Sequence, residues 1–164
     1  MSLLDLWESN RSNILGYSIW QLVQMAGDGQ LRDDSNCSSE LRRFFSLISS
    51  EKLASYISDC IEEPFKDSGL VLQDMVNELG RRLDFDVTPG HYRGSPSKIG
   101  NDGLWQAKNW SFVVEVKKTD AYRIDLERIA GYRNALMSQS TVGERSSTLI
   151  IVGRADTGGL EAEI

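Results

Sequence analysis

The strongest constraint on the fold is a change in hydrophobic periodicity close to Phe85. Before this residue, apolar side chains recur at the spacing of helices that bury one face. After it, short apolar runs such as FDV, SFVVEV and STLIIV are separated by glycine and proline. Helices followed by strands, with one further helix between the last two strands, predict an α/β fold with helices packed on a sheet.

The same patterns give the expected elements. Helices are predicted over residues 12–25, 40–49 (with Ser39 as its N-cap), 53–61, 65–83 and 122–137. Strands are predicted over residues 85–87, 104–105, 110–117 and 147–152, and the middle two are joined by the turn QAKN. We expect an N-terminal helical region over residues 1–63 and an α/β core over residues 64–164. The sequence ends at LEAEI without a stop signal, so we expect a truncated core and a further C-terminal domain in the full-length protein.

Composition excludes several classes of protein. The wholly apolar runs are too short to cross a bilayer, and no basic start precedes a long apolar stretch, so neither a membrane protein nor a secreted one is expected. Cys37 and Cys60 are far apart in the sequence, which favours reduced thiols in the cytoplasm. His91 is the only histidine, which excludes a zinc site built from several histidines.

Charge is unevenly distributed along the chain. The net charge is -6, but residues 81–154 contain 12 lysines and arginines against 8 acidic residues, and the remainder contains 6 against 16. The second half is therefore the basic one. This excess permits contact with phosphate, although a basic surface that is merely solvated explains it equally well.

Three residues in this basic half form a pattern that suggests chemistry. Asp102 precedes Gly103, and the apolar strand that follows the QAKN turn ends in Glu115 and Lys117. Alternation along a strand puts Glu115 and Lys117 on one face. If the turn pairs Trp105 with Trp110, Asp102 lies opposite Val113 and is a diagonal neighbour of Glu115, roughly 7–8 Å away.

Two carboxylates at that separation can share a divalent cation. Mg²⁺ (or Mn²⁺) fits, because it accepts a few oxygen ligands and keeps several waters. A lysine on the same face could orient a water and stabilise charge that develops on phosphorus. The alternative is that the E-x-K pair is an ordinary solvated pair on a strand, as most such pairs are. The preceding aspartate, its glycine and the apolar strand favour the metal site.

The chain contains, in this order, a helix, Asp102-Gly103, Glu115-Val116-Lys117, a second helix and a strand. This order resembles the PD-(D/E)XK nuclease superfamily, the fold of many restriction endonucleases. The resemblance covers about residues 65–152 and implies a mixed central sheet flanked by helices that cuts DNA phosphodiesters with Mg²⁺. It also implies that Asp102, Glu115 and the Val116 carbonyl are metal ligands and that Lys117 positions the water. Asn101 stands where the family has proline.

Many members of this superfamily carry one more acidic residue on the first core helix. Asp74 and Glu78 are the candidates, four residues apart and so on one helix face, and we favour Glu78 as the catalytic one. The alternative for both is a solvated charge on the helix surface.

Nucleic-acid contacts are expected from two other segments. Arg128 and Tyr132 lie one turn apart on the helix after the E-V-K strand, where the family often places a polar residue near the phosphate. Tyr92 and Arg93 lie in the loop PGHYRG and could contact phosphates or bases. His91 reads more simply as an ordinary loop residue, and Tyr132 could equally belong to the core.

The sequence thus predicts a metal-dependent endonuclease domain of a larger restriction, defence or repair enzyme. The rival prediction is a non-catalytic nucleic-acid-binding or protein-interaction module that keeps the fold. The substrate stays open between duplex, single-stranded, modified or branched DNA, and RNA. Many nucleases of this fold dimerise, but no feature of the sequence decides whether this chain forms a homodimer.

Overall fold

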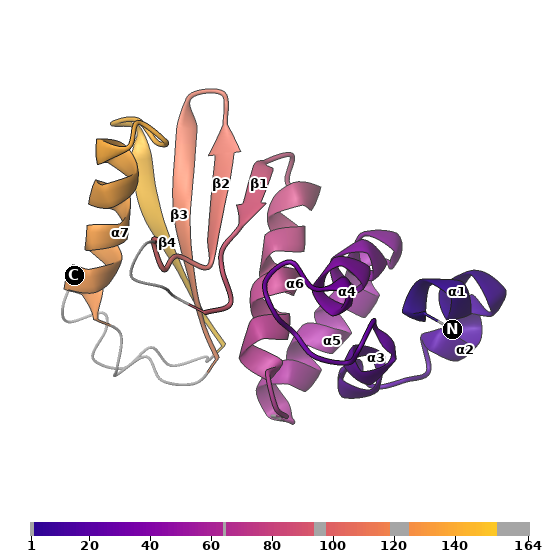
Figure 1. Cartoon of the computed structure of the whole chain (residues 1–164). Coiled ribbons are helices and arrows are strands. Elements are labelled where there is room, and N and C mark those ends of the chain that lie inside the picture. The colour runs from indigo at the N-terminus through magenta and orange to yellow at the C-terminus, as the bar shows by residue number, and fades with distance from the viewer. Residues whose placement is uncertain (1, 64, 94–97, 119–124, 154–164) are drawn as a thin grey trace. The chain divides into compact units, whose positions relative to one another are not determined.

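The computed structural model describes residues 2–63, 65–93, 98–118 and 125–153. This part of the chain is α/β, with seven helices and a four-stranded mixed sheet (Figure 1). The elements are α1 (Leu3–Ser9), α2 (Arg11–Ile14), α3 (Ile19–Met25), α4 (Asn36–Leu47), α5 (Ser50–Glu62), α6 (Ser68–Arg82), β1 (Asp86–Pro89), β2 (Gly103–Ala107), β3 (Trp110–Lys117), α7 (Leu126–Ser138) and β4 (Ser146–Val152).

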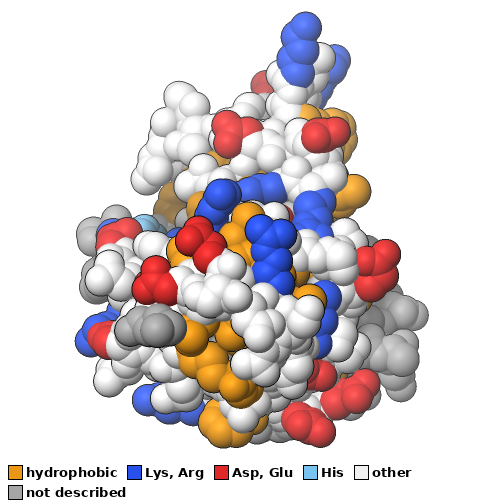
Figure 2. Space-filling view, turned by 90° about the vertical axis from the view of Figure 1, so that its right-hand side faces the viewer, with side chains coloured by type: hydrophobic (Ala, Val, Ile, Leu, Met, Phe, Trp, Pro, Cys, Tyr) orange, Lys and Arg blue, Asp and Glu red, His pale blue; other side chains and the backbone are white. Residues whose placement is uncertain are grey.

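The chain forms two compact units, Met1–Glu78 and Leu79–Ile164. The expected division at residues 63 and 64 stays a prediction. None of the described helices is both long enough and apolar enough to cross a membrane. On the face shown in Figure 2, acidic and basic side chains are interspersed.

The first unit is a helical bundle built around aromatic residues. Trp7 of α1 meets Phe44 of α4 edge to face, with 5.3 Å between ring centroids. Tyr56 of α5 is fully buried, and its hydroxyl donates a hydrogen bond to the Tyr17 carbonyl at 3.3 Å. These contacts join segments that are distant in sequence, so the apolar stripes of the separate helices form one core.

Two helices of this unit differ from their predicted bounds. The predicted helix over residues 12–25 is interrupted, because the Ser18 side chain and Gln21 form a capping box that starts α3 afresh at Ile19. The next predicted helix, capped by Ser39, instead begins at Asn36. Its N-cap is Ser35, whose hydroxyl accepts from the Ser38 N–H at 3.2 Å.

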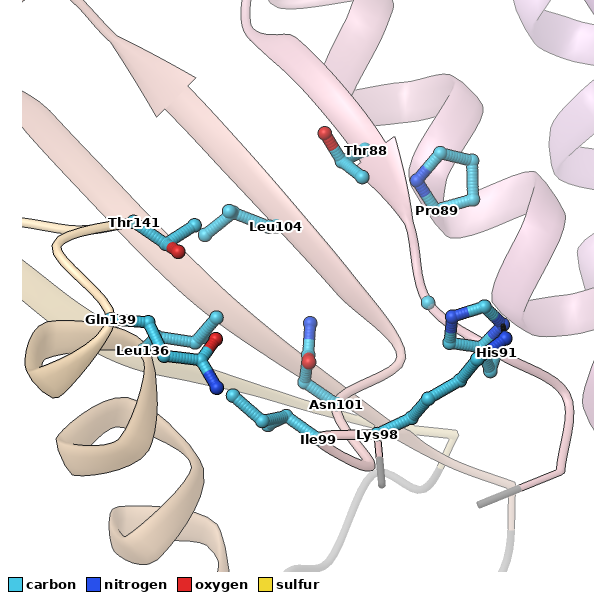
Figure 3. Close-up of a pocket in the computed structure, with 11 residues that line it drawn as sticks. Thr88, Pro89, His91, Lys98, Ile99, Asn101, Leu104, Leu136, Gln139 and Thr141 are labelled. Atoms are coloured by element: carbon cyan, nitrogen blue, oxygen red, sulfur yellow. Dashed lines mark hydrogen bonds between the residues drawn. The ribbon is translucent and has the colours of Figure 1, made fainter. Parts of the chain in front are cut away.

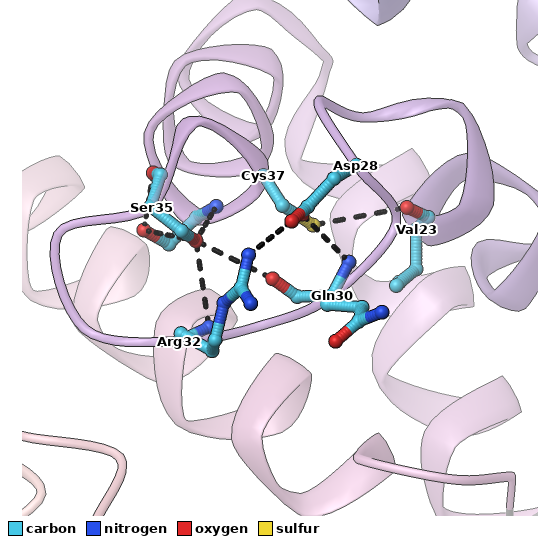
Figure 4. A network of polar contacts seen from close by, with 7 residues as sticks. Val23, Asp28, Gln30, Arg32, Ser35 and Cys37 are labelled. Carbon is cyan, nitrogen blue, oxygen red and sulfur yellow. Dashed lines mark hydrogen bonds and ion pairs between the residues drawn. The ribbon is translucent and has the colours of Figure 1, made fainter.

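A polar loop joins α3 to α4 (Figure 4). Asp28 and Arg32 form an exposed ion pair four residues apart. Beneath it, the Cys37 thiol donates to the Val23 carbonyl at 3.8 Å, and burial raises the pKa of this thiol to about 11. Cys37 and Cys60 are both buried and free. Cys37 is thus protonated at neutral pH and acts as a packing residue.

The sheet of the second unit has the order β1-β2-β3-β4. The first three strands are antiparallel, and β4 is parallel to β3. Ala107 pairs with Trp110, so β2 and β3 are joined by a two-residue turn, Lys108–Asn109. The predicted pairing of Trp105 with Trp110 is wrong, because Trp105 lies opposite Phe112. This difference changes the position of Asp102 along β3.

The helix α7 makes the crossover between the parallel strands and packs on one face of the sheet. Leu136 of this helix joins a buried cluster with Leu104 of β2 and Val113 of β3. Its N-cap is Asp125, whose side chain accepts from the Arg128 N–H at 2.9 Å. Tyr122, where the sequence predicts the start of this helix, lies outside the described residues.

An aromatic cluster covers part of the sheet in the same unit. Phe85 lies 5.7 Å from Trp105 and 5.8 Å from Phe112, measured between ring centroids. Gly80, near the end of α6, packs so closely on Trp105 that a Cβ at this position would lie 2.5 Å from the indole ring. The cluster therefore packs on the middle of β2 and β3, and Glu115 and Lys117 lie beyond it, toward the end of β3.

Candidate metal centre

Glu115 lies near the end of β3, where the strand changes from apolar to polar residues. Alternation puts it on the same face as Val113 and Lys117. Val113 is 1% exposed and belongs to the cluster beneath α7. The strand therefore carries Glu115 into the protein interior, where the residue is only 3% exposed.

Asp102 immediately precedes β2. Gly103 pairs with Val114, and the regular pairing stops there, because Asp102 bonds through its N–H to Val114 and through its side chain to Val116. The expectation that Asp102 lies opposite Val113 is wrong, because Val113 pairs with Leu104, and the diagonal placement beside Glu115 stays a prediction. Glu115 lies near enough for its charge to raise the pKa of Asp102, so the two carboxylates are neighbours.

Backbone contacts hold Asp102 against β3. Its own N–H donates to the Val114 carbonyl at 2.9 Å. Its Oδ2 accepts from the Val116 N–H at 2.7 Å. The side chain is therefore oriented by the strand that carries Glu115, and a charge-assisted bond of this length is a strong one.

Glu115 has an unequal environment at its two oxygens. Oε1 forms an ion pair with the Lys117 ammonium, on the same face of the strand. Oε2 is buried and has no hydrogen-bond partner among the described residues. A buried carboxylate oxygen without a partner is costly, so this atom marks a position where a cation or another donor would be stabilising.

The acidity of Asp102 reflects the same crowding of negative charge. Burial, followed by the nearby charge of Glu115, raises the pKa of Asp102 to about 6 from its ordinary 3.8. The hydrogen bond from Val116 and the charge of Lys117 oppose this rise. Glu115 acts on Asp102 in this way because like charges in one site disfavour joint ionisation.

Gly90, which the sequence analysis did not single out, supports this arrangement. Its N–H donates to the Asp102 carbonyl at 2.9 Å. A Cβ at Gly90 would lie 2.0 Å from the Asn101 carbonyl oxygen and 2.6 Å from the Asp102 carbonyl carbon. Only glycine allows the two backbones to approach so closely. The Pro89-Gly90 pair at the end of β1 was the available signal, and it does not reveal this distant contact.

Asn101 occupies the position of the family's proline and has a role of its own. It is 8% exposed, and its side-chain amide donates to the Gly103 carbonyl at 3.0 Å. This bond spans Asp102 and closes the local turn that leads into β2. An amide thus fixes the backbone around Asp102.

The two candidate helix acids belong to the first unit. Asp74 is 1% exposed and accepts from Arg42 Nε at 2.9 Å, and Glu78 is 5% exposed. Burial argues against the solvated-surface alternative for both residues. Asp74 has a cationic partner inside its own unit, which favours a structural role. Glu78 is the last residue of the first unit, and its role beside Asp102 stays a prediction.

The expected nucleic-acid contacts have mixed surroundings. Arg93 and Arg128 are exposed and accessible to a phosphate. Tyr92 is buried. Tyr132 packs against the clusters beneath α7, and its hydroxyl would lie 3.0 Å from a Cβ at Gly100. These positions favour the arginines as ligand contacts and the core alternative for Tyr132. Their roles in nucleic-acid binding stay predictions.

The residues present fit a magnesium-type site with few protein ligands. Among the described residues, no group of three or more histidines, cysteines, aspartates and glutamates could hold a metal. Mg²⁺ is usually bound by one or two carboxylates and otherwise by water and substrate. Asp102 and Glu115 are two carboxylates of this kind, and their role as ligands stays a prediction. The Val116 carbonyl stays a predicted third ligand.

Comparisons with known proteins found no match: no family model fits the sequence, and no curated protein or solved structure is similar to the chain.

Proposed function

We propose that the second unit is a PD-(D/E)XK-type nuclease domain that hydrolyses DNA phosphodiesters with Mg²⁺ or Mn²⁺. One observation carries the proposal. Asp102 is bonded to the Val116 N–H and feels the charge of Glu115, Lys117 is paired to Glu115, and one buried Glu115 oxygen has no partner among the described residues. The mixed sheet, with α7 between its parallel strands, is compatible with the restriction-endonuclease-like fold.

Asp102, Glu115 and Lys117 have different roles in the proposed reaction. Asp102 and Glu115 bind the cation, which when bound polarises a phosphate oxygen and lowers the pKa of a water. The hydrogen bond from Val116 fixes the orientation of Asp102, so the site is preorganised. The Lys117 side chain is 31% exposed and Glu115 is 4% exposed, so the ammonium lies on the solvent side of the pair. From there it orients the attacking water and stabilises charge that develops on the phosphate.

The raised pKa of Asp102 is consistent with this assignment. Perturbed carboxylates held together by burial and like charge are typical of functional sites, because such an arrangement disfavours the empty state. A divalent cation supplies the positive charge that the two carboxylates lack. The exposed arginines, Arg93 and Arg128, would add phosphate contacts.

Plasmid cleavage tests the proposal. Supercoiled DNA is incubated with the full chain in Mg²⁺ or Mn²⁺, beside EDTA and the Glu115→Gln variant. Metal-dependent nicking that falls at least about 10³-fold in the variant, equivalent to roughly 4 kcal/mol of transition-state stabilisation, is expected. Glu144→Gln, an exposed change in the same unit, is the control and keeps wild-type nicking.

Two outcomes would count against the nuclease assignment. Nicking that survives Glu115→Gln means that another site, or a contaminant, cuts the DNA. Absence of nicking by the wild type on plasmid, single-stranded and branched DNA favours the non-catalytic module instead.

A further inference from the structure

A pocket of about 280 Å³ lies in the second unit next to the candidate metal centre (Figure 3). Asn101 in its wall is the residue before Asp102. Leu104 in its wall pairs with Val113, which is on the same face of β3 as Glu115. The pocket therefore lies on the face of the sheet that carries Glu115.

The lining combines apolar surface with amides. Ile99, Leu104 and Leu136 supply the apolar part, and Asn101 and Gln139 supply groups that both donate and accept hydrogen bonds. Figure 3 shows Gln139 and Leu136 on one side, with Asn101 between them and the loop after β1. Asn101 is buried and held by its bond to the Gly103 carbonyl, so its amide is fixed in orientation.

The charge of the lining limits the occupant. Among the described residues that line the pocket, none is an aspartate or glutamate. Lys98 and His91 lie together at one side, with Lys98 Nζ 3.4 Å from His91 Nδ1. A neutral planar ligand with donors and acceptors on its edge suits the amides and the apolar wall. A phosphate attached to it would meet the lysine.

Size points to the same class of ligand. A pocket of about 280 Å³ has space for a single heterocyclic base. Asparagine and glutamine amides are also the side chains that pair with the edge of adenine.

We infer that this pocket holds one unstacked base of the DNA strand beside the bond to be cut, an inference that rests on the proposed nuclease function. Pulling a base from the stack is least costly where it is mismatched, damaged or single-stranded. The inference therefore assigns the substrate class as DNA with an unpaired base near the cleavage position. Asn101 and Gln139 contact the base edge, and Lys98 contacts the adjoining phosphate.

Fluorescence of 2-aminopurine tests the inference independently of cleavage, because this base brightens when it leaves the stack. The full chain is titrated in Ca²⁺ with a single strand and with a mismatched duplex, each carrying one 2-aminopurine. The wild type is expected to increase the emission. Gln139 is exposed and lines the pocket, so the indole ring of Gln139→Trp would occupy the space of the base. This variant is expected to remove the increase in emission and to weaken DNA binding about tenfold, which is in the range for losing the contacts of one base with a protein.

Asn134→Trp, an exposed change on α7 that does not line the pocket, is the matched control and keeps the increase. An equal increase in Gln139→Trp, or none in a wild type that nicks plasmid with metal, overturns the inference and leaves the nuclease proposal standing. A free 2-aminopurine nucleoside that binds as tightly as the strand also overturns it, in favour of a free nucleotide. If the wild type neither binds DNA nor nicks it, the nuclease proposal itself fails.

Discussion

Buried carboxylates have different charged neighbours in the two units. In the first, Asp74 is buried with an arginine, and Arg42 Nε donates to it at 2.9 Å. In the second, the charge of Glu115 raises the pKa of Asp102, Lys117 pairs with Glu115, and a Glu115 oxygen has no partner among the described residues. The first arrangement matches each charge with a partner. The second places two carboxylates close enough that one raises the pKa of the other.

This difference separates a structural charge from a candidate functional one. A buried carboxylate that is paired with a cationic side chain of its own unit does not need a bound ligand to offset its charge. A pair that repels itself is stabilised by a ligand that brings positive charge, and proteins keep such sites where the ligand does chemistry. The same substitution should therefore have opposite effects in the two places.

The largest expected effect comes from removing the partner of Asp74. Arg42→Met leaves a buried carboxylate without its cation and is expected to lower the free energy of unfolding by about 3 kcal/mol, the lower end for a broken buried pair because Arg42 is partly exposed. Denaturation by urea measures it. Arg43→Met, an exposed neighbour on the same helix, should change stability by less than about 0.5 kcal/mol. Equal losses in the two variants would remove the contrast.

Gly90→Ala tests the backbone support of Asp102. The new Cβ would overlap the Asn101 carbonyl oxygen, so the backbone must move, at an expected cost of about 2 kcal/mol. Plasmid nicking should fall with it, because Asp102 loses its place beside Val116. Gly131→Ala in α7, where a Cβ meets nothing within 4 Å, should keep nicking and slightly raise stability. Wild-type nicking by Gly90→Ala would show that this contact does not position the site.

The pH dependence of stability follows from Asp102. Its pKa is raised in the folded state, so between the ordinary value of 3.8 and about 6 the folded protein binds more protons than the unfolded chain. Stability from this residue is therefore greatest at low pH and is lost as the pH rises through about 6. Each pKa unit is worth about 1.36 kcal/mol, and partial exposure reduces the loss to about 2 kcal/mol.

Urea denaturation in EDTA across this pH range checks the sign. Other carboxylates also titrate there, so the quantity to compare is the wild type minus Asp102→Asn. A difference that stays constant with pH would contradict the raised pKa.

The smallest expected effect compares the sign of the change in the free energy of unfolding when an aspartate is neutralised in each unit. Asp102→Asn keeps an oxygen for the Val116 N–H but removes the repulsion by Glu115, so at pH 8 without metal it should raise the free energy of unfolding by about 1 kcal/mol. Asp74→Asn should lower it, because the charge that Arg42 pairs with is lost. Two changes of the same sign would show that the sites are electrostatically alike.

The sequence predicted the parts of this molecule that depend on local patterns. The run FVVEV indicated β3, and alternation along it correctly put Glu115 and Lys117 on one face. The α/β class followed from the change of period near Phe85. In each case, a repeating pattern within one segment was enough.

What the sequence did not predict depends on contacts between segments. Ile14 and Ile19 continue one helical stripe, and only the capping box at Ser18 shows that the helix restarts. The register of β2 against β3 depends on a two-residue turn, and Lys108-Asn109 has no glycine to mark it. The approach of Gly90 to Asp102 joins residues from different strands, so periodicity could not reveal it.

The most direct test of the account is whether Asp102 and Glu115 bind a divalent cation together. Thermal unfolding of the full chain is measured at pH 8 over increasing Mg²⁺, with Asp102→Asn and Glu115→Gln beside the wild type. The midpoint of the wild type should rise with Mg²⁺, as it does for any ligand that binds the folded state alone, and both variants should respond far less. A wild type that does not respond, or variants that respond equally, would contradict the metal site.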